Sequence, residues 1–170
     1  IPQARGIAPG NGTLVSAVHT AVGRLPIVAG KPEVAIFDEA FERFGSRNAL
    51  MIGDRLDTDI LGANRAGIPS VLVLTGIDKA KQVLAASLDE RPTYILDDLR
   101  QLHLPYPTSE TVEVGGVVDT IVGSARVRRA GYVLSVESGS GVDLLRAGAA
   151  AIWNSGLAIY ALDVPAELYS

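Results

Sequence analysis

The sequence contains no cysteine, only two histidines and no long apolar run. Without a thiol, disulfides, zinc-thiolate sites and thiol nucleophiles are excluded. His19 and His103 have no partner near them in the sequence, which argues against a histidine triad or a zinc centre. No apolar run reaches the roughly 18 residues that span a bilayer, so no membrane is expected as a partner. The lack of cysteine fits a reducing cytoplasm, which is the compartment we expect.

Positive charge is also scarce. The chain has 15 Lys and Arg against 19 Asp and Glu, and its longest basic cluster is the pair Arg128-Arg129. This balance argues against nucleic acid or an anionic membrane as the partner. With 170 residues, 48% of them hydrophobic, the chain can hold one ordinary domain and a small appendage. It opens with Ile1 and a loop-like stretch to Gly6, which we interpret as a truncated or processed amino terminus.

Short apolar runs alternate with helical patterns between residues 14 and 102. The runs predicted as strands are 26–29, 49–52, 70–74 and 94–96. The segments predicted as helices are 14–22, 36–44, 59–66 and 79–86, with a helical turn at 99–102. Alternating strands and helices imply βαβ units. The predicted fold is therefore α/β, with a Rossmann-like parallel sheet and helices on both faces.

A linker at residues 103–110, marked by two prolines, separates this part from a different pattern. Beyond it, residues 112–122, 126–137 and 157–164 are predicted as strands, and a helix is predicted over 142–153. Residues 111–170 are thus expected to form a small α+β tail domain. Because about 60 residues fold alone only marginally, we expect the tail to dock on the first domain or on another subunit of a homo-oligomer.

The run from Gly53 to Ile60 carries the clearest chemical signal. Asp54 follows an apolar strand and Asp59 begins a helix, and ligands bind at this edge of a parallel sheet. The plain alternative is that Asp54 only starts a loop and Asp59 only favours the helix N-terminus. Lys31, at the end of an earlier apolar run, favours the functional interpretation, since a lysine there can neutralise a transferring phosphoryl group. A nucleotide P-loop is excluded, because its glycine spacing and hydroxyl residue are missing.

These motifs resemble the haloacid dehalogenase superfamily. The resemblance rests on Gly30-Lys31-Pro32 and on the later run Gly53-Asp54-Arg55-x-x-Thr58-Asp59-Ile60. The nearest branch has a large α/β cap and includes p-nitrophenylphosphatases and phosphoglycolate phosphatases. The tail resembles an extension of actinobacterial members, such as glycerol 3-phosphate phosphatases.

The resemblance implies a role for four residues and Mg²⁺ as the cofactor. Lys31 would be catalytic and would bind the substrate, because it steadies the nucleophile and the phosphoryl oxygens. Asp54 would bind the metal. Asp59 would be catalytic and would support the metal waters or Lys31, and Arg55 would reach the substrate at the mouth of the pocket. Asp57 occupies a variable position and is given no role.

The family's nucleophile, in an Asp-x-Asp motif, and its Ser/Thr motif lie upstream of this chain. The adjacent pair Asp97-Asp98 does not replace them. Residues 1–24 are expected to be the end of the cap with its return to the core, and residues 25–102 the carboxy-terminal half of the core. An aspartyl-phosphate mechanism needs the missing nucleophile, so this chain alone is expected to be inactive. Its expected partner is the amino-terminal half of the same protein.

The leading hypothesis is a Mg²⁺-dependent phosphatase that hydrolyses a small phosphorylated metabolite. Glycerol 3-phosphate or a phosphoglycolate-like compound would be the natural substrate, and p-nitrophenyl phosphate an artificial one. A non-catalytic scaffold or assembly module is the alternative. A receiver-type signalling domain fits poorly, because here the acidic pair follows the lysine and opens a helix.

Overall fold

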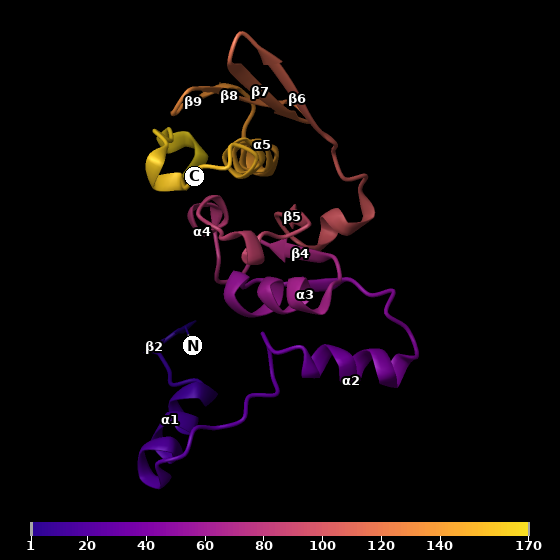
Figure 1. Ribbon diagram of the computed structural model, residues 1–170, viewed down its shortest axis with the longest axis vertical. Helices are drawn as coiled ribbons and strands as arrows, with labels where there is room; N and C mark the ends of the chain where they lie inside the picture. The colour runs from indigo at the N-terminus through magenta and orange to yellow at the C-terminus, as the bar shows by residue number, and fades with distance from the viewer. Residues whose placement is uncertain (1, 170) are drawn as a thin grey trace.

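The chain was analysed as a computed structural model that describes residues 2–169. Strands β3 (Met51–Gly53), β4 (Ser70–Val73) and β5 (Tyr94–Leu96) form a parallel sheet in the order β3-β4-β5. Figure 1 labels β4 and β5 of this sheet. All four residues of β4 are buried, as is typical of the inner strand of a covered parallel sheet. The predicted α/β fold with a parallel sheet is confirmed.

Helices α2 (Ala35–Phe44) and α3 (Leu61–Ala66) pack against one another beside this sheet. Phe37 and Phe41 of α2 are buried in a cluster with Ala63 and Ala66 of α3. Phe44, the last residue of α2, lies outside this cluster and is 79% exposed. Both helices end at a glycine with positive φ, a conformation that non-glycine residues rarely adopt.

The amino-terminal segment makes few contacts with the rest of the chain. Two short strands, β1 (Pro2–Gln3) and β2 (Gly6–Ile7), precede helix α1 (Asn11–Val22), which has no buried residue. The prediction of a strand at 26–29 is wrong, because the segment is extended but unpaired and Ile27 is 98% exposed. A strand needs a neighbour to take up its backbone hydrogen bonds, and the described residues place none beside it.

The tail contains one antiparallel sheet of four strands, joined by three tight turns, where the sequence predicted two long strands. Strands β6 (Ser109–Val114) and β7 (Val117–Val122) turn at Gly115-Gly116, and β8 (Ala125–Ala130) and β9 (Val133–Ser138) turn at Gly131-Tyr132. Glycines at 115 and 116 both have positive φ, which tight hairpin turns require. That Gly-Gly signal was present in the sequence and was missed.

The rest of the tail is mostly helical. Helix α5 (Gly141–Trp153) agrees with the predicted 142–153. The predicted strand at 157–164 is wrong, because a 3-10 turn, Ile159–Ala161, occupies it and only Asp163 forms an isolated bridge, with Val133. Among residues 2–169, no helix has both the length and the apolar character needed to cross a membrane.

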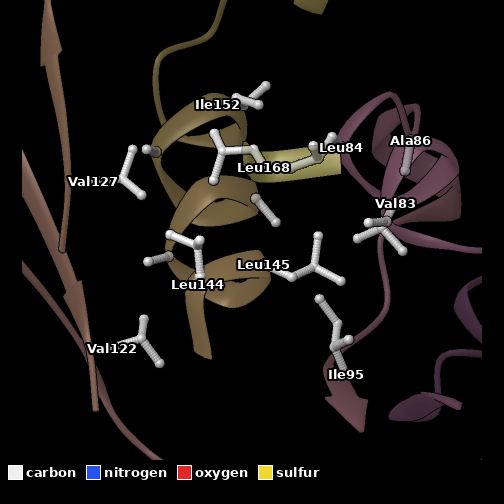
Figure 2. Packing of buried hydrophobic residues seen from close by; sticks show 14 of the residues in the cluster. Val83, Leu84, Ala86, Ile95, Val122, Val127, Leu144, Leu145, Ile152 and Leu168 are labelled. Carbon is white, nitrogen blue, oxygen red and sulfur yellow. The ribbon is translucent and has the colours of Figure 1, made fainter. Parts of the chain in front are cut away.

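One hydrophobic core joins the tail to the α/β part. Helix α5 lies between the tail sheet and helix α4 (Ala80–Leu84), as Figure 2 shows. Leu144 faces Val122 and Val127 of the tail sheet, and Leu145 faces Val83 of α4 and Ile95 of β5. Burial of this shared apolar surface supplies the main stabilisation that a tail of this size lacks alone.

A polar contact also fastens the tail to the outer strand of the parallel sheet. The Arg146 guanidinium donates to the Ile95 carbonyl from Nε at 2.9 Å and from Nη2 at 2.6 Å. It lies 4.5 Å from the centre of the Tyr106 ring and pairs with Asp143 at 2.7 Å. The Ile95 amide donates to the Tyr106 hydroxyl at 3.1 Å. The tail and the linker thus satisfy backbone groups at the free edge of β5.

Replacement of this arginine tests the attachment. We expect Arg146→Ala to lower the free energy of unfolding by about 3 kcal/mol, because it removes charge-assisted hydrogen bonds from a side chain that is 9% exposed. Urea denaturation measures the loss. The control is Arg100→Ala, whose side chain is 91% exposed and should leave the free energy of unfolding close to that of the wild type. Equal losses in the two variants would contradict the role of Arg146.

Candidate active site

Two loops meet at the carboxyl edge of the parallel sheet. Strand β3 ends at Gly53, and Asp54 follows it directly. A π-helical turn, Leu56–Ile60, then leads into α3. The loop after β4 brings Gly76 and its neighbours to the same edge, which is where α/β sheets bind ligands.

Lys31 and Asp59 are joined although 28 positions separate them. Lys31 Nζ donates to Asp59 Oδ1 at 2.6 Å, and Asp59 Oδ2 accepts the amides of Asp54 and Arg55, both at 3.1 Å. Asp59 is 4% exposed, whereas the Lys31 side chain is 42% exposed. A Cβ on Gly53 would lie 2.3 Å from Asp59 Cβ, so only glycine fits there. Asp59 therefore anchors an accessible ammonium group at the sheet edge.

The Asp54 turn is fastened to the loop that follows β4. Asp54 Oδ2 accepts the Ile77 amide at 2.9 Å, and the Asp54 carbonyl accepts the Asp78 amide at 3.0 Å. Asp78 Oδ2 in turn accepts the Leu56 amide at 2.6 Å. A Cβ on Gly76 would fall 2.0 Å from Asp54 Oδ2. Sequence reasoning missed this loop, although a glycine and an aspartate just beyond a buried strand were a usable signal.

Arg55 is paired with the neighbour that the sequence interpretation left without a role. Its Nε and Nη2 donate to the two carboxylate oxygens of Asp57, at 2.9 and 2.6 Å. The hydrogen bond that Arg55 donates to Asp57 raises the pKa of Arg55 above its usual value, with smaller contributions from the charges of Asp57, Asp78 and Asp54. Both side chains of the pair are about half exposed. Arg55 is therefore a charged group held at the surface beside Asp54.

The pair Asp97-Asp98 has a structural role. Asp98 accepts the Arg100 amide and so caps the 3-10 turn Leu99–His103. Hydrogen bonds from the Arg100 side chain and amide lower the pKa of Asp98 to about 2. Asp97 contacts Gln101 through its carboxylate and its amide. Both acids thus order the turn after β5.

The residues present fit one part of a magnesium site. Mg²⁺ takes hard oxygen ligands and is commonly held by one or two carboxylates with water and substrate phosphate. Hydrogen bonds within residues 2–169 occupy both oxygens of Asp59 but reach only Oδ2 of Asp54. Asp54 Oδ1 is thus the carboxylate oxygen available to a cation. The described residues contain no group of three or more His, Asp or Glu side chains placed to hold a metal.

Comparison with known proteins agrees with this geometry. Residues 28–102, which include Lys31, Asp54 and Asp59, match the HAD-hydrolase-like family model. The chain is 42% identical over 163 residues to the D-glycerol 3-phosphate phosphatase of Mycobacterium tuberculosis, covering 91% of this chain and 44% of that protein. It is 37% identical over 108 residues to the 5'-nucleotidase YutF of Bacillus subtilis, covering 62% and 41%.

A solved structure gives the same picture. The glycerol phosphate phosphatase of Mycobacterium tuberculosis, crystallised with magnesium, superposes with a TM-score of 0.67 and 40% identity. The match covers 91% of this chain, so it extends into the tail, and 46% of that structure. This chain thus spans less than half the length of these relatives. Residues 28–102 are therefore similar to the HAD-like hydrolases, and the motifs around Lys31 and Asp54 lie within this match.

Proposed function

We propose that this chain is the carboxy-terminal half of a Mg²⁺-dependent phosphatase that acts on a small phosphorylated metabolite. The observation that carries the proposal is the contact between Lys31 and Asp59, which lies on the same sheet edge as Asp54. It places one accessible cation and one available carboxylate oxygen at the place where α/β sheets bind ligands. The phosphatases named above, which share this segment, support the same interpretation.

In this proposal each residue performs a task that its contacts suit. Lys31 binds a phosphoryl oxygen and offsets the negative charge that grows there during transfer. Asp59 holds the Lys31 ammonium in place, so it works through Lys31 and through the amides of the Asp54 turn. Asp54 offers Oδ1 to the metal. Arg55, which Asp57 holds at the surface, lies where it can contact the rest of the substrate.

Magnesium, when bound, would neutralise charge on the phosphoryl group and orient it. The chain holds one of the carboxylates that such an ion needs, and the proposal assigns the remaining protein ligands to an upstream segment. The same segment would supply the nucleophilic aspartate that forms the aspartyl-phosphate. The isolated chain is therefore proposed to be inactive.

Exposed apolar surface supports an upstream partner of this kind. Strand β3 is an edge strand, and its Ile52 is 37% exposed beside Leu50 at 43%. Ile27 and Val28, just before Lys31, are 98% and 58% exposed. An unpaired strand edge with exposed apolar residues marks an interaction surface. We propose that it receives the amino-terminal half of the same protein.

The names of the relatives support the proposed substrate class. The Mycobacterium tuberculosis proteins are named for glycerol phosphate, and they match 91% of this chain, including part of the tail. We therefore propose glycerol 3-phosphate first, with a phosphoglycolate-like ester second and p-nitrophenyl phosphate as an artificial substrate.

Loss of the metal ligand tests the function. In the protein that includes the upstream half, Asp54→Ala should lower Mg²⁺-dependent kcat with glycerol 3-phosphate about 100- to 1000-fold, since charge stabilisation of the transferring group is lost. Phosphate release measures the rate. Asp89→Ala, which removes an exposed aspartate outside the site, should keep wild-type kcat. If Asp54→Ala turned over substrate as fast as the unmutated protein, Asp54 would not belong to the site. If the unmutated protein showed no phosphatase activity, the scaffold alternative would be favoured.

The lysine provides a second, independent test. Lys31→Met keeps the length of the side chain but removes the charge that Asp59 holds in place, so kcat should fall about 100-fold. Steady-state kinetics in the same protein measure kcat and KM separately. The matched control is Lys79→Met, because Lys79 follows β4 on a neighbouring loop and its ammonium contacts the Leu74 carbonyl, outside the Asp54 turn. Equal effects in both variants would argue against a specific role for Lys31.

A further inference from the structure

The loop after β4 holds the Asp54 turn through hydrogen bonds in both directions. The Asp54 side chain and carbonyl accept the amides of Ile77 and Asp78, at 2.9 and 3.0 Å. The Asp78 carboxylate accepts the Leu56 amide at 2.6 Å. The two loops are therefore clasped, with each loop providing both donors and acceptors to the other.

The clasp determines which oxygen of Asp54 is available. The Ile77 amide occupies Oδ2, and Gly76 lies so close that any Cβ would reach within 2.0 Å of that oxygen. The carboxylate is thus held in one orientation, with Oδ1 left over. A carboxylate fixed in this way loses little conformational freedom when it coordinates a cation, and this favours cation binding.

Asp78 is well placed to stabilise the clasp because its loop leads into the core. Helix α4 begins at Ala80, two residues after Asp78, and its Val83 and Leu84 are 0% and 1% exposed in the shared core with α5. The Asp54 turn, by contrast, lies beside the edge strand β3. The hydrogen bond from Leu56 to Asp78 therefore ties a turn at the edge of the sheet to a buried, rigid helix.

We propose that Asp78 is a positioning residue for the metal site: its carboxylate holds the Leu56 amide and so keeps Asp54 Oδ1 in place for Mg²⁺. The inference rests on the proposed function only in its choice of Mg²⁺. Asp78 acts as a hydrogen-bond acceptor in this role, so its negative charge is not what matters. An asparagine, which retains a side-chain oxygen, should therefore replace it, whereas an alanine should not.

Calorimetric titration with Mg²⁺, in the protein that includes the upstream half, tests the proposal without any turnover. We expect Asp78→Ala to weaken Mg²⁺ binding about 10-fold, as loss of an outer hydrogen-bond partner commonly does. Asp78→Asn should stay within about threefold of wild type. The matched control is Asp97→Ala. The Asp97 carboxylate also follows a strand, β5, at the same sheet edge, but it contacts Gln101 and not the Asp54 turn.

Amide hydrogen exchange reports the clasp itself. The Leu56 amide should exchange at least about 10-fold faster in Asp78→Ala than in wild type or Asp78→Asn, because its acceptor is gone. Thermal unfolding of each variant shows that it is folded. In steady-state kinetics, Asp78→Ala should raise the Mg²⁺ concentration that gives the half-maximal rate. The KM for the phosphate ester at saturating Mg²⁺ should stay within about twofold of wild type. General destabilisation would not change the first quantity while leaving the second unchanged.

The outcomes separate this inference from the proposed function. Unchanged Mg²⁺ affinity in Asp78→Ala, with binding lost in Asp54→Ala, would overturn the positioning role and leave the phosphatase proposal standing. Equal weakening in Asp78→Ala and Asp78→Asn would overturn the acceptor role. If wild type binds Mg²⁺ but hydrolyses no phosphate ester, the function fails while the predicted order of affinities still supports the role of Asp78. A wild-type protein that binds no Mg²⁺ overturns both.

Discussion

The ion pair between Lys31 and Asp59 is the contact on which the site depends. It joins a loop before α2 to the turn after β3, and the same carboxylate accepts two amides of that turn. A carboxylate that is 4% exposed is costly to bury alone, so its three donors offset the lost hydration. Because hydrogen bonds occupy both carboxylate oxygens of Asp59, Asp54 Oδ1 is the carboxylate oxygen that can bind a cation. The different roles of Asp59 and Asp54 thus follow from their burial and from the hydrogen-bond donors around them.

A second constraint lies beneath this edge of the sheet. Helix α4 packs against α5 of the tail, and the two share one hydrophobic core with β4 and β5. The clasp between the Asp54 turn and the loop after β4 therefore rests on a surface that the tail helps to build. Arg146 adds a polar attachment at the edge of β5. The tail is in this sense a structural support of the α/β part, which gives it a role apart from any contact with substrate.

The opposite edge of the sheet has a different character. Ile52 of β3 is 37% exposed, the segment around Ile27 and Val28 is apolar and exposed, and α1 has no buried residue. These features agree with a chain that spans less than half of its relatives. The site residues lie next to this edge, since Asp54 follows β3 directly. The proposed upstream half would thus cover the apolar surface and complete the ligand set in one docking event.

The sequence by itself determined the α/β alternation and the grouping of Lys31, Asp54 and Asp59, because these depend on local patterns and on the rule that strand ends share one edge. It also indicated the family. The tertiary structure decided which contacts form. Residues 26–29 have strand composition but no neighbour to pair with, and the tail strands divide into hairpins at glycines that allow tight turns. The clasp through Asp78 depends on two loops brought together by packing. Such contacts join residues from separate segments, and no local pattern specifies them.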